Sequence, residues 1–131
     1  MRRDIDADSP AAWIEHAKAD LTLAGISPPP GVFYELLCFH AQQAAEKAIK
    51  AILIHFGANF PYTHNLQRLI EFLPAELQAL PGIAQAAALS PYAVLTRYPG
   101  ETEPVSKEEH EEAVNVASEV VRLAESVVLG R

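Results

Sequence analysis

Apolar residues recur at helical spacing along most of the chain, and proline and glycine divide them into segments. The first segment begins at Ser9-Pro10, an N-cap residue followed by proline at the first helical position. It predicts a helix over Ala11–Ala24, whose apolar face carries residues three and four apart, namely Trp13, Ala17, Leu21 and Ala24. Gly25 and the prolines that follow it end this helix.

The second segment predicts the longest helix, from Val32 to about Phe56, because this stretch contains neither glycine nor proline. Its apolar positions step by three or four residues: Phe33, Leu37, Ala41, Ala44, Ala48 and Ile52. Such a helix is about 37 Å long and is expected at the centre of the fold. Its many alanines allow neighbouring helices to approach closely, and Gly57 ends it.

Three shorter segments follow, and then a long final helix. Between Phe60-Pro61-Tyr62 and Pro74 we expect a short helix with Thr63 or His64 as its cap, and 75–80 adds a turn. Pro81-Gly82 restarts the chain into a helix from Ile83 to about Leu95. The last helix begins with the capping box of Ser106 and Glu109, runs to about Leu129 and ends at Gly130.

Helical periodicity throughout, with no alternating strand pattern, predicts an all-α protein, an up-and-down bundle of four or five helices. The 131 residues, half of them apolar, suit one domain over residues 1–131. The single cysteine, Cys38, is expected to be a buried small hydrophobe. The chain shows neither a secretory signal nor an apolar run of the ~20 residues that span a bilayer, so we expect a cytoplasmic protein without membrane contact.

The chain carries 17 acidic and 10 basic side chains, a formal charge of −7. Binding to bulk nucleic acid is therefore not expected, because such binding depends on lysine and arginine that neutralise phosphates. Residues 101–112 contain six acids and one lysine and so hold most of this charge. This acidic stretch either stabilises the N-terminus of the last helix or faces a basic partner.

Metal and cofactor sites are not indicated. The five histidines include no pair three to five residues apart, there is no Cys-x-x-Cys, and the glycine-rich phosphate loops are missing. We expect no metal and no cofactor.

Charged residues on the long helix leave two interpretations open. Glu46 and Lys50 could form a solvated i, i+4 pair worth only about 0.3–0.5 kcal/mol. Alternatively, Lys47 and Lys50 could join Arg97 in holding a phosphate. Arg97 and Tyr98 offer a planar fork and a stacking ring, or else they close the preceding helix onto the bundle.

Three motifs in order resemble a prokaryotic HEPN domain, and the similarity spans essentially the whole chain. They are the stretch from Phe39 to Ala51, then Thr63-His64-Asn65-Leu66, then Arg97-Tyr98-Pro99 before the capped last helix. The resemblance implies a helical bundle, commonly a homodimer, often paired with a small nucleotidyltransferase in a toxin-antitoxin-like pair. It also implies nucleotide binding, or metal-independent ribonuclease activity in members where a histidine follows an arginine by four to six residues.

No arginine in this sequence has a histidine at that spacing, and the histidine after Arg97 is His110, thirteen residues on. The leading hypothesis is therefore a non-catalytic, dimeric binding module that partners a nucleotidyltransferase or a nucleotide. Its candidate nucleotide or phosphate contacts are Lys47, Lys50, Arg97, Tyr98 and His64, and no catalytic residue is assigned. The alternatives are a ribonuclease toxin that uses Arg97 with His64 or His110, and a purely structural dimeric bundle.

Overall fold

The computed structural model describes residues 9–94 and 104–131, and every regular element in these residues is helical. Three long helices form the frame: α1 (Pro10–Ala24), α2 (Tyr34–His55) and α6 (Lys107–Leu129). Four short elements connect α2 to α6: α3 (Leu66–Ile70), α4 (Ala75–Gln78), α5 (Pro81–Ala84) and the 3₁₀ helix η2 (Gln85–Ala93). The predicted all-α bundle is thereby confirmed.

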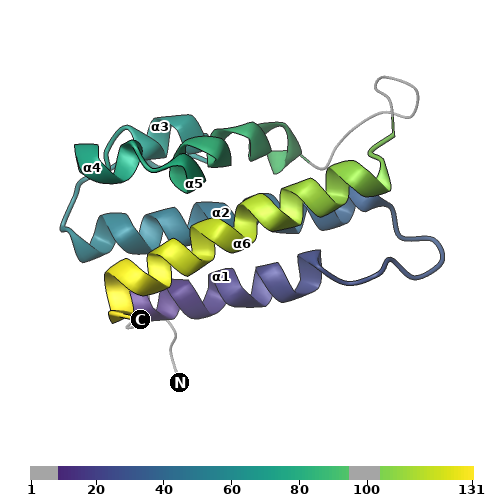
Figure 1. Cartoon of the computed structure of the whole chain (residues 1–131), viewed down its shortest axis with the longest axis horizontal. Coiled ribbons are helices and arrows are strands. Elements are labelled where there is room, and N and C mark those ends of the chain that lie inside the picture. Colours follow the sequence, from purple (N-terminus) through teal and green to yellow (C-terminus); the bar gives the residue numbers. More distant parts are fainter. Residues whose placement is uncertain (1–8, 95–103) are drawn as a thin grey trace.

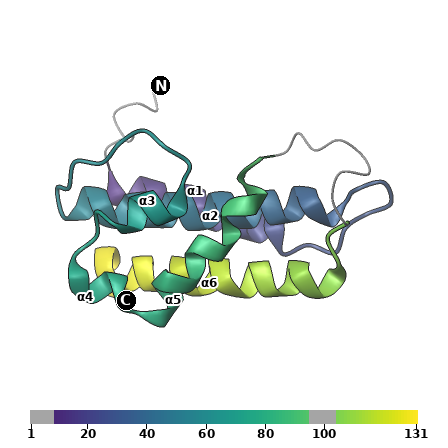
Figure 2. The same cartoon turned by 90° about the horizontal axis from the view of Figure 1, so that it is seen from above.

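Helix α2 occupies the centre of the molecule (Figure 1), with α1 along one side and α3–α5 and η2 along the other. Helix α6 packs across both α1 and α2. Seen from above, η2 runs from α5 beside α6 towards α2 (Figure 2). The central position predicted from the length of α2 is therefore correct.

Alanine lines much of the buried surface of α2. Five alanines of this helix are fully buried, which allows α1 and α6 to approach its backbone: Ala41, Ala44, Ala45, Ala48 and Ala51. Large apolar side chains from the surrounding elements complete the core, among them Ile14, Leu66, Ile83 and Val120. Each such side chain contributes roughly 1.5–3 kcal/mol on burial, so the core rather than the caps provides most of the stability.

The helix ends predicted from local sequence are largely confirmed. The Ser9 side chain accepts a hydrogen bond from the Ala12 N–H at 3.2 Å. In the capping box Ser106 and Glu109 exchange hydrogen bonds of 3.0 Å. Gly57 and Gly130 take positive φ angles of 68° and 71° after α2 and α6, a conformation that costs glycine nothing.

The predicted cap of the third helix is wrong, because Asn65 caps α3 in place of Thr63 or His64. The Asn65 side-chain oxygen accepts from the Arg68 N–H at 3.1 Å. The Thr63 hydroxyl instead accepts from the Asn65 N–H at 3.1 Å, in a tight turn that precedes the helix.

The helix predicted from Ile83 to about Leu95 is α-helical only to Ala84 and continues as η2 to Ala93. Pro91 lies within this element and has no N–H to donate to an α-helical ladder. Small alanine side chains on η2 add little packing that would favour the α-helix. The predicted end at Leu95 lies outside the described residues.

Candidate functional site

A buried carboxylate organises the polar residues of α2. Glu46 is only 2% exposed and accepts hydrogen bonds from Gln42 Nε2 at 3.1 Å, Lys50 Nζ at 2.9 Å and His64 Nδ1 at 2.9 Å. Gln42, Glu46 and Lys50 follow one another at four-residue spacing on α2, whereas His64 arrives from the loop before α3. We call these four residues the Glu46 cluster.

His64 is held in a defined orientation by this cluster. Its backbone carbonyl accepts from Gln42 Nε2 at 3.3 Å, while its ring bonds to Glu46. An ionised carboxylate can only accept, so Nδ1 of His64 carries the proton, and in the neutral ring Nε2 is left as an acceptor. More than half of the His64 side chain is exposed (57%), so the imidazole is accessible to a ligand.

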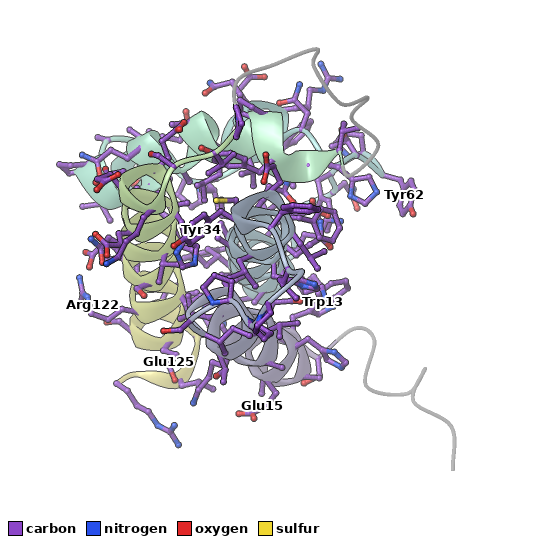
Figure 3. The ribbon with its side chains drawn as sticks, turned by 90° about the vertical axis from the view of Figure 1, so that its right-hand side faces the viewer. Trp13, Glu15, Tyr34, Tyr62, Arg122 and Glu125 are labelled. Carbon is purple, nitrogen blue, oxygen red and sulfur yellow. The ribbon has the colours of Figure 1, made fainter. Side chains whose placement is uncertain are left out.

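Two aromatic rings flank the Glu46 cluster. Lys50 Nζ lies 5.8 Å from the ring centroid of Trp13 and 5.7 Å from that of Tyr62, within range of cation–π attraction. The Tyr62 ring also meets the His64 ring edge-on at 5.8 Å and is 91% exposed. Trp13 from α1 and Tyr62 from the loop after α2 lie on the same side of the molecule (Figure 3).

Lys47 belongs to a separate group. Its Nζ donates to Asp20 Oδ2 at 2.6 Å, and the other oxygen of Asp20 bonds to His40 Nδ1 at 3.0 Å. These three side chains, which we call the Asp20 cluster, link α1 to α2 and are partly buried. Gln43 contacts the Glu46 cluster instead, because its Nε2 donates to Gln42 Oε1 at 2.7 Å.

The structure therefore brings together two of the five predicted site residues, Lys50 and His64, through Glu46. It places Lys47 on Asp20, and Arg97 and Tyr98 lie outside the described residues. The interpretation of Glu46 and Lys50 as a solvated pair is wrong, because they are 2% and 7% exposed. They are buried because α1 and the loop before α3 both cover this part of α2.

Sequence reasoning missed the central role of Glu46 and the contributions of Gln42, Asp20, Trp13 and Tyr62. A signal in the sequence was present for Glu46 and Gln42. Gln42, Glu46 and Lys50 recur at four-residue spacing on α2, so their side chains are neighbours on one face of the helix and can bond to one another.

His110 is occupied by a structural contact. It is 7% exposed, and its Nε2 lies 2.6 Å from the carbonyl oxygen of Ala24, the last residue of α1. Since a carbonyl only accepts, Nε2 carries the proton and caps the end of α1. Its ring packs against Tyr34 at 5.1 Å. Cys38 is fully buried, as predicted.

Within residues 9–94 and 104–131, no three side chains of His, Cys, Asp or Glu gather in a way that could hold a metal ion. None of the helices described is both long and apolar enough to cross a membrane.

Comparison with known proteins agrees with the fold. The family model for the HEPN domain matches residues 11–127. The crystal structure of an archaeal HEPN homologue superposes with a TM-score of 0.70 at 26% sequence identity, covering 92% of this chain and 98% of that one. No curated protein matches the chain. Because the family model spans most of the sequence, the chain belongs to the HEPN family.

Proposed function

We propose that this HEPN domain acts by binding rather than by catalysis, as the partner of a small nucleotidyltransferase in a toxin-antitoxin-like pair. We place a nucleotide site on the face of α2 that carries the Glu46 cluster. The observation that carries this assignment is the Tyr62 ring, 91% exposed beside His64 and Lys50.

An exposed ring next to cationic groups suits a nucleotide, because a base stacks on the ring while nearby donors meet its phosphates. Lys50 keeps only 8% of its side chain exposed, whereas Lys47 keeps 26%. We therefore assign the phosphate contacts to Lys47, with Arg97 and Tyr98 as further candidates. His64 lines the site with Nε2 as an acceptor, which suits an N–H of the base and not a phosphate oxygen. Lys50 holds Glu46 and supports the Tyr62 ring.

Two observations favour binding over RNA cleavage. The sequence contains no arginine followed by histidine after four to six residues. His110, one of the two histidines that a nuclease could use, donates a hydrogen bond from its Nε2–H to the carbonyl oxygen of Ala24 inside the bundle. Moving His110 out of the bundle would leave the buried carbonyl of Ala24 without its donor, at a cost of about 1–3 kcal/mol.

Titration calorimetry with ATP and with GTP tests the nucleotide site. We expect the wild-type protein to bind at least one of them, and Tyr62→Ala to weaken that binding about tenfold or more, because stacking on an aromatic ring is worth about 1–3 kcal/mol per base. Trp13, the only tryptophan, lies beside Lys50, so its fluorescence gives a second readout.

Tyr62→Phe keeps the ring and is expected to bind as wild type does. Phe33→Ala removes a ring that is 73% exposed at the N-cap of α2 and serves as the matched control. If the wild-type protein binds neither nucleotide, or if Phe33→Ala and Tyr62→Ala weaken binding equally, the site is not where we place it.

A further inference from the structure

A second surface, remote from the Glu46 cluster in the sequence, is hollowed between η2 and the N-terminal half of α6. The groove has a volume of about 480 Å³. Its floor is apolar and is formed by Leu89, Ala113 and Val116, which are at most 7% exposed. We call it the α6–η2 groove.

The groove follows from the divergence of two elements. At Gly82 the chain lies so close to α6 that an added Cβ would be 2.6 Å from Glu119 Cγ. From there η2 runs away from α6 towards α2 (Figure 2). Four η2 residues line the widening gap, namely Gln85, Ala88, Leu89 and Tyr92, and among them Ala88 has a side chain too small to fill it.

One wall of the groove is acidic. It consists of Glu108, Glu109 and Glu112, all exposed on α6, and none of the described lining residues is basic. Glu109 already accepts from the Ser106 N–H in the capping box. Glu108 and Glu112 lie four residues apart on one face of α6, and neither carboxylate bonds to another residue within 9–94 and 104–131.

The combination of apolar floor and acidic wall determines the chemistry of an occupant. Lysine and arginine cover apolar surface with their stems while their charged ends reach carboxylates. From Glu108 to Val116 the groove follows α6 for about 12 Å, the length of two to three helical turns. We propose that the α6–η2 groove is a docking site for a short amphipathic segment of a partner protein, with one or two large apolar side chains beside lysine or arginine.

A fluorescent 14-residue peptide of leucine and lysine, arranged with one apolar helical face, serves as the probe. A peptide of the same composition in an order that destroys this face is its control. In fluorescence anisotropy we expect the amphipathic peptide to bind the wild-type protein about tenfold more tightly than the scrambled one. Equal binding of the two peptides, or no binding, would overturn the proposal.

Variants separate the groove from the overall negative charge. Glu108→Lys/Glu112→Lys is expected to reduce affinity about tenfold or more, whereas Glu71→Lys/Glu76→Lys, the same change in net charge on exposed residues elsewhere, leaves most of it. Ala88→Trp fills the groove without a change of charge and is expected to lower affinity, while Ala75→Trp on exposed α4 is not.

Equal losses in the two charge-reversed variants would show that attraction is general and would refute the site. Unchanged affinity of Ala88→Trp for the amphipathic peptide would also refute the site. If the wild-type protein self-associates and Ala88→Trp makes it monomeric, a second copy of this chain occupies the groove, and the assignment to a different partner is wrong.

Discussion

At the residue scale, Glu46 is the side chain on which the candidate site depends. Three donors converge on one carboxylate inside the bundle, and one of them, Lys50, is itself 7% exposed. A buried pair of this kind contributes little relative to an apolar pair of the same shape, but removing one partner leaves the other as an uncompensated charge. The stability of the protein is therefore sensitive to the loss of either Glu46 or Lys50 alone and less sensitive to the replacement of both by apolar residues.

We expect Glu46→Gln to lower the free energy of unfolding by about 3–5 kcal/mol, because Lys50 remains charged and buried. Lys50→Met is expected to cost a similar amount, because it leaves the buried Glu46 carboxylate without its cation. The double variant should lose clearly less than the sum of the two, and urea denaturation of all four proteins measures this coupling.

Arg122→Gln is the control for an exposed ion pair. Arg122 donates to Glu119 at 2.6 and 3.0 Å, and this hydrogen bond lowers the pKa of the Glu119 carboxyl. Both side chains are well exposed, so its loss should change stability little. Strict additivity of Glu46→Gln and Lys50→Met would contradict the coupling that we infer.

The limit of sequence-based prediction is visible at this scale. The capping contacts of Ser9 and of Ser106 with Glu109 could be predicted because each joins residues three apart. The bond of His64 to Glu46 joins residues 18 apart and depends on the path of the loop after α2, for which no local pattern exists. Lys50 and His64 could therefore be selected as candidates, and Glu46 could be paired with Lys50, but the bond that joins Glu46 to His64 could not be predicted.

At the scale of the elements, the predicted helix bounds agree with the structure where the local sequence determines the helix strongly. Helices α1, α2 and α6 have long apolar periods and clear end signals, and they form close to the predicted bounds. The segment from Pro81 to Ala93 has small side chains and an internal Pro91, and it changes from α to 3₁₀ geometry. There the local sequence determines an α-helix only weakly, because Pro91 lacks an N–H.

The close approach of α5 to α6 gives a prediction at this scale. Gly82→Ala would place a methyl group 2.6 Å from Glu119 Cγ and 3.0 Å from Leu123 Cδ1. Overpacking of this kind costs about 1–3 kcal/mol, and the better helix propensity of alanine offsets up to about 1 kcal/mol. We expect a net loss of stability, measured as a lower melting temperature.

Glu119→Ala removes the nearer obstacle, so the variant Gly82→Ala/Glu119→Ala should recover part of that loss. A Gly82→Ala protein that melts at or above the wild-type temperature would show that α6 moves aside without cost.

At the scale of the whole molecule, the bundle leaves large apolar side chains exposed at several places, among them Phe33, Phe56, Tyr62 and Val94. The alanines of α2 are buried within the chain and so are not available to a second copy. The helices that would meet in a dimer therefore stay unassigned. Dimerisation and the nucleotidyltransferase partner stay predictions.

Native mass spectrometry of the protein purified from its own cells measures both. We expect species at twice the chain mass of 14.3 kDa and a larger species that contains a nucleotidyltransferase. A protein of 14.3 kDa alone at micromolar concentration would contradict both expectations.

The contact between His110 and Ala24 has a consequence for how the chain is assembled. It joins residues 86 apart, whereas Asp20 and His40 join α1 to α2 across only 20. Because the entropy of closing a loop grows with the logarithm of its length, the longer closure costs about 1.3 kcal/mol more. The pair of α1 and α2 is thus the less costly unit to form first, and α6 closes onto it from the far end of the chain.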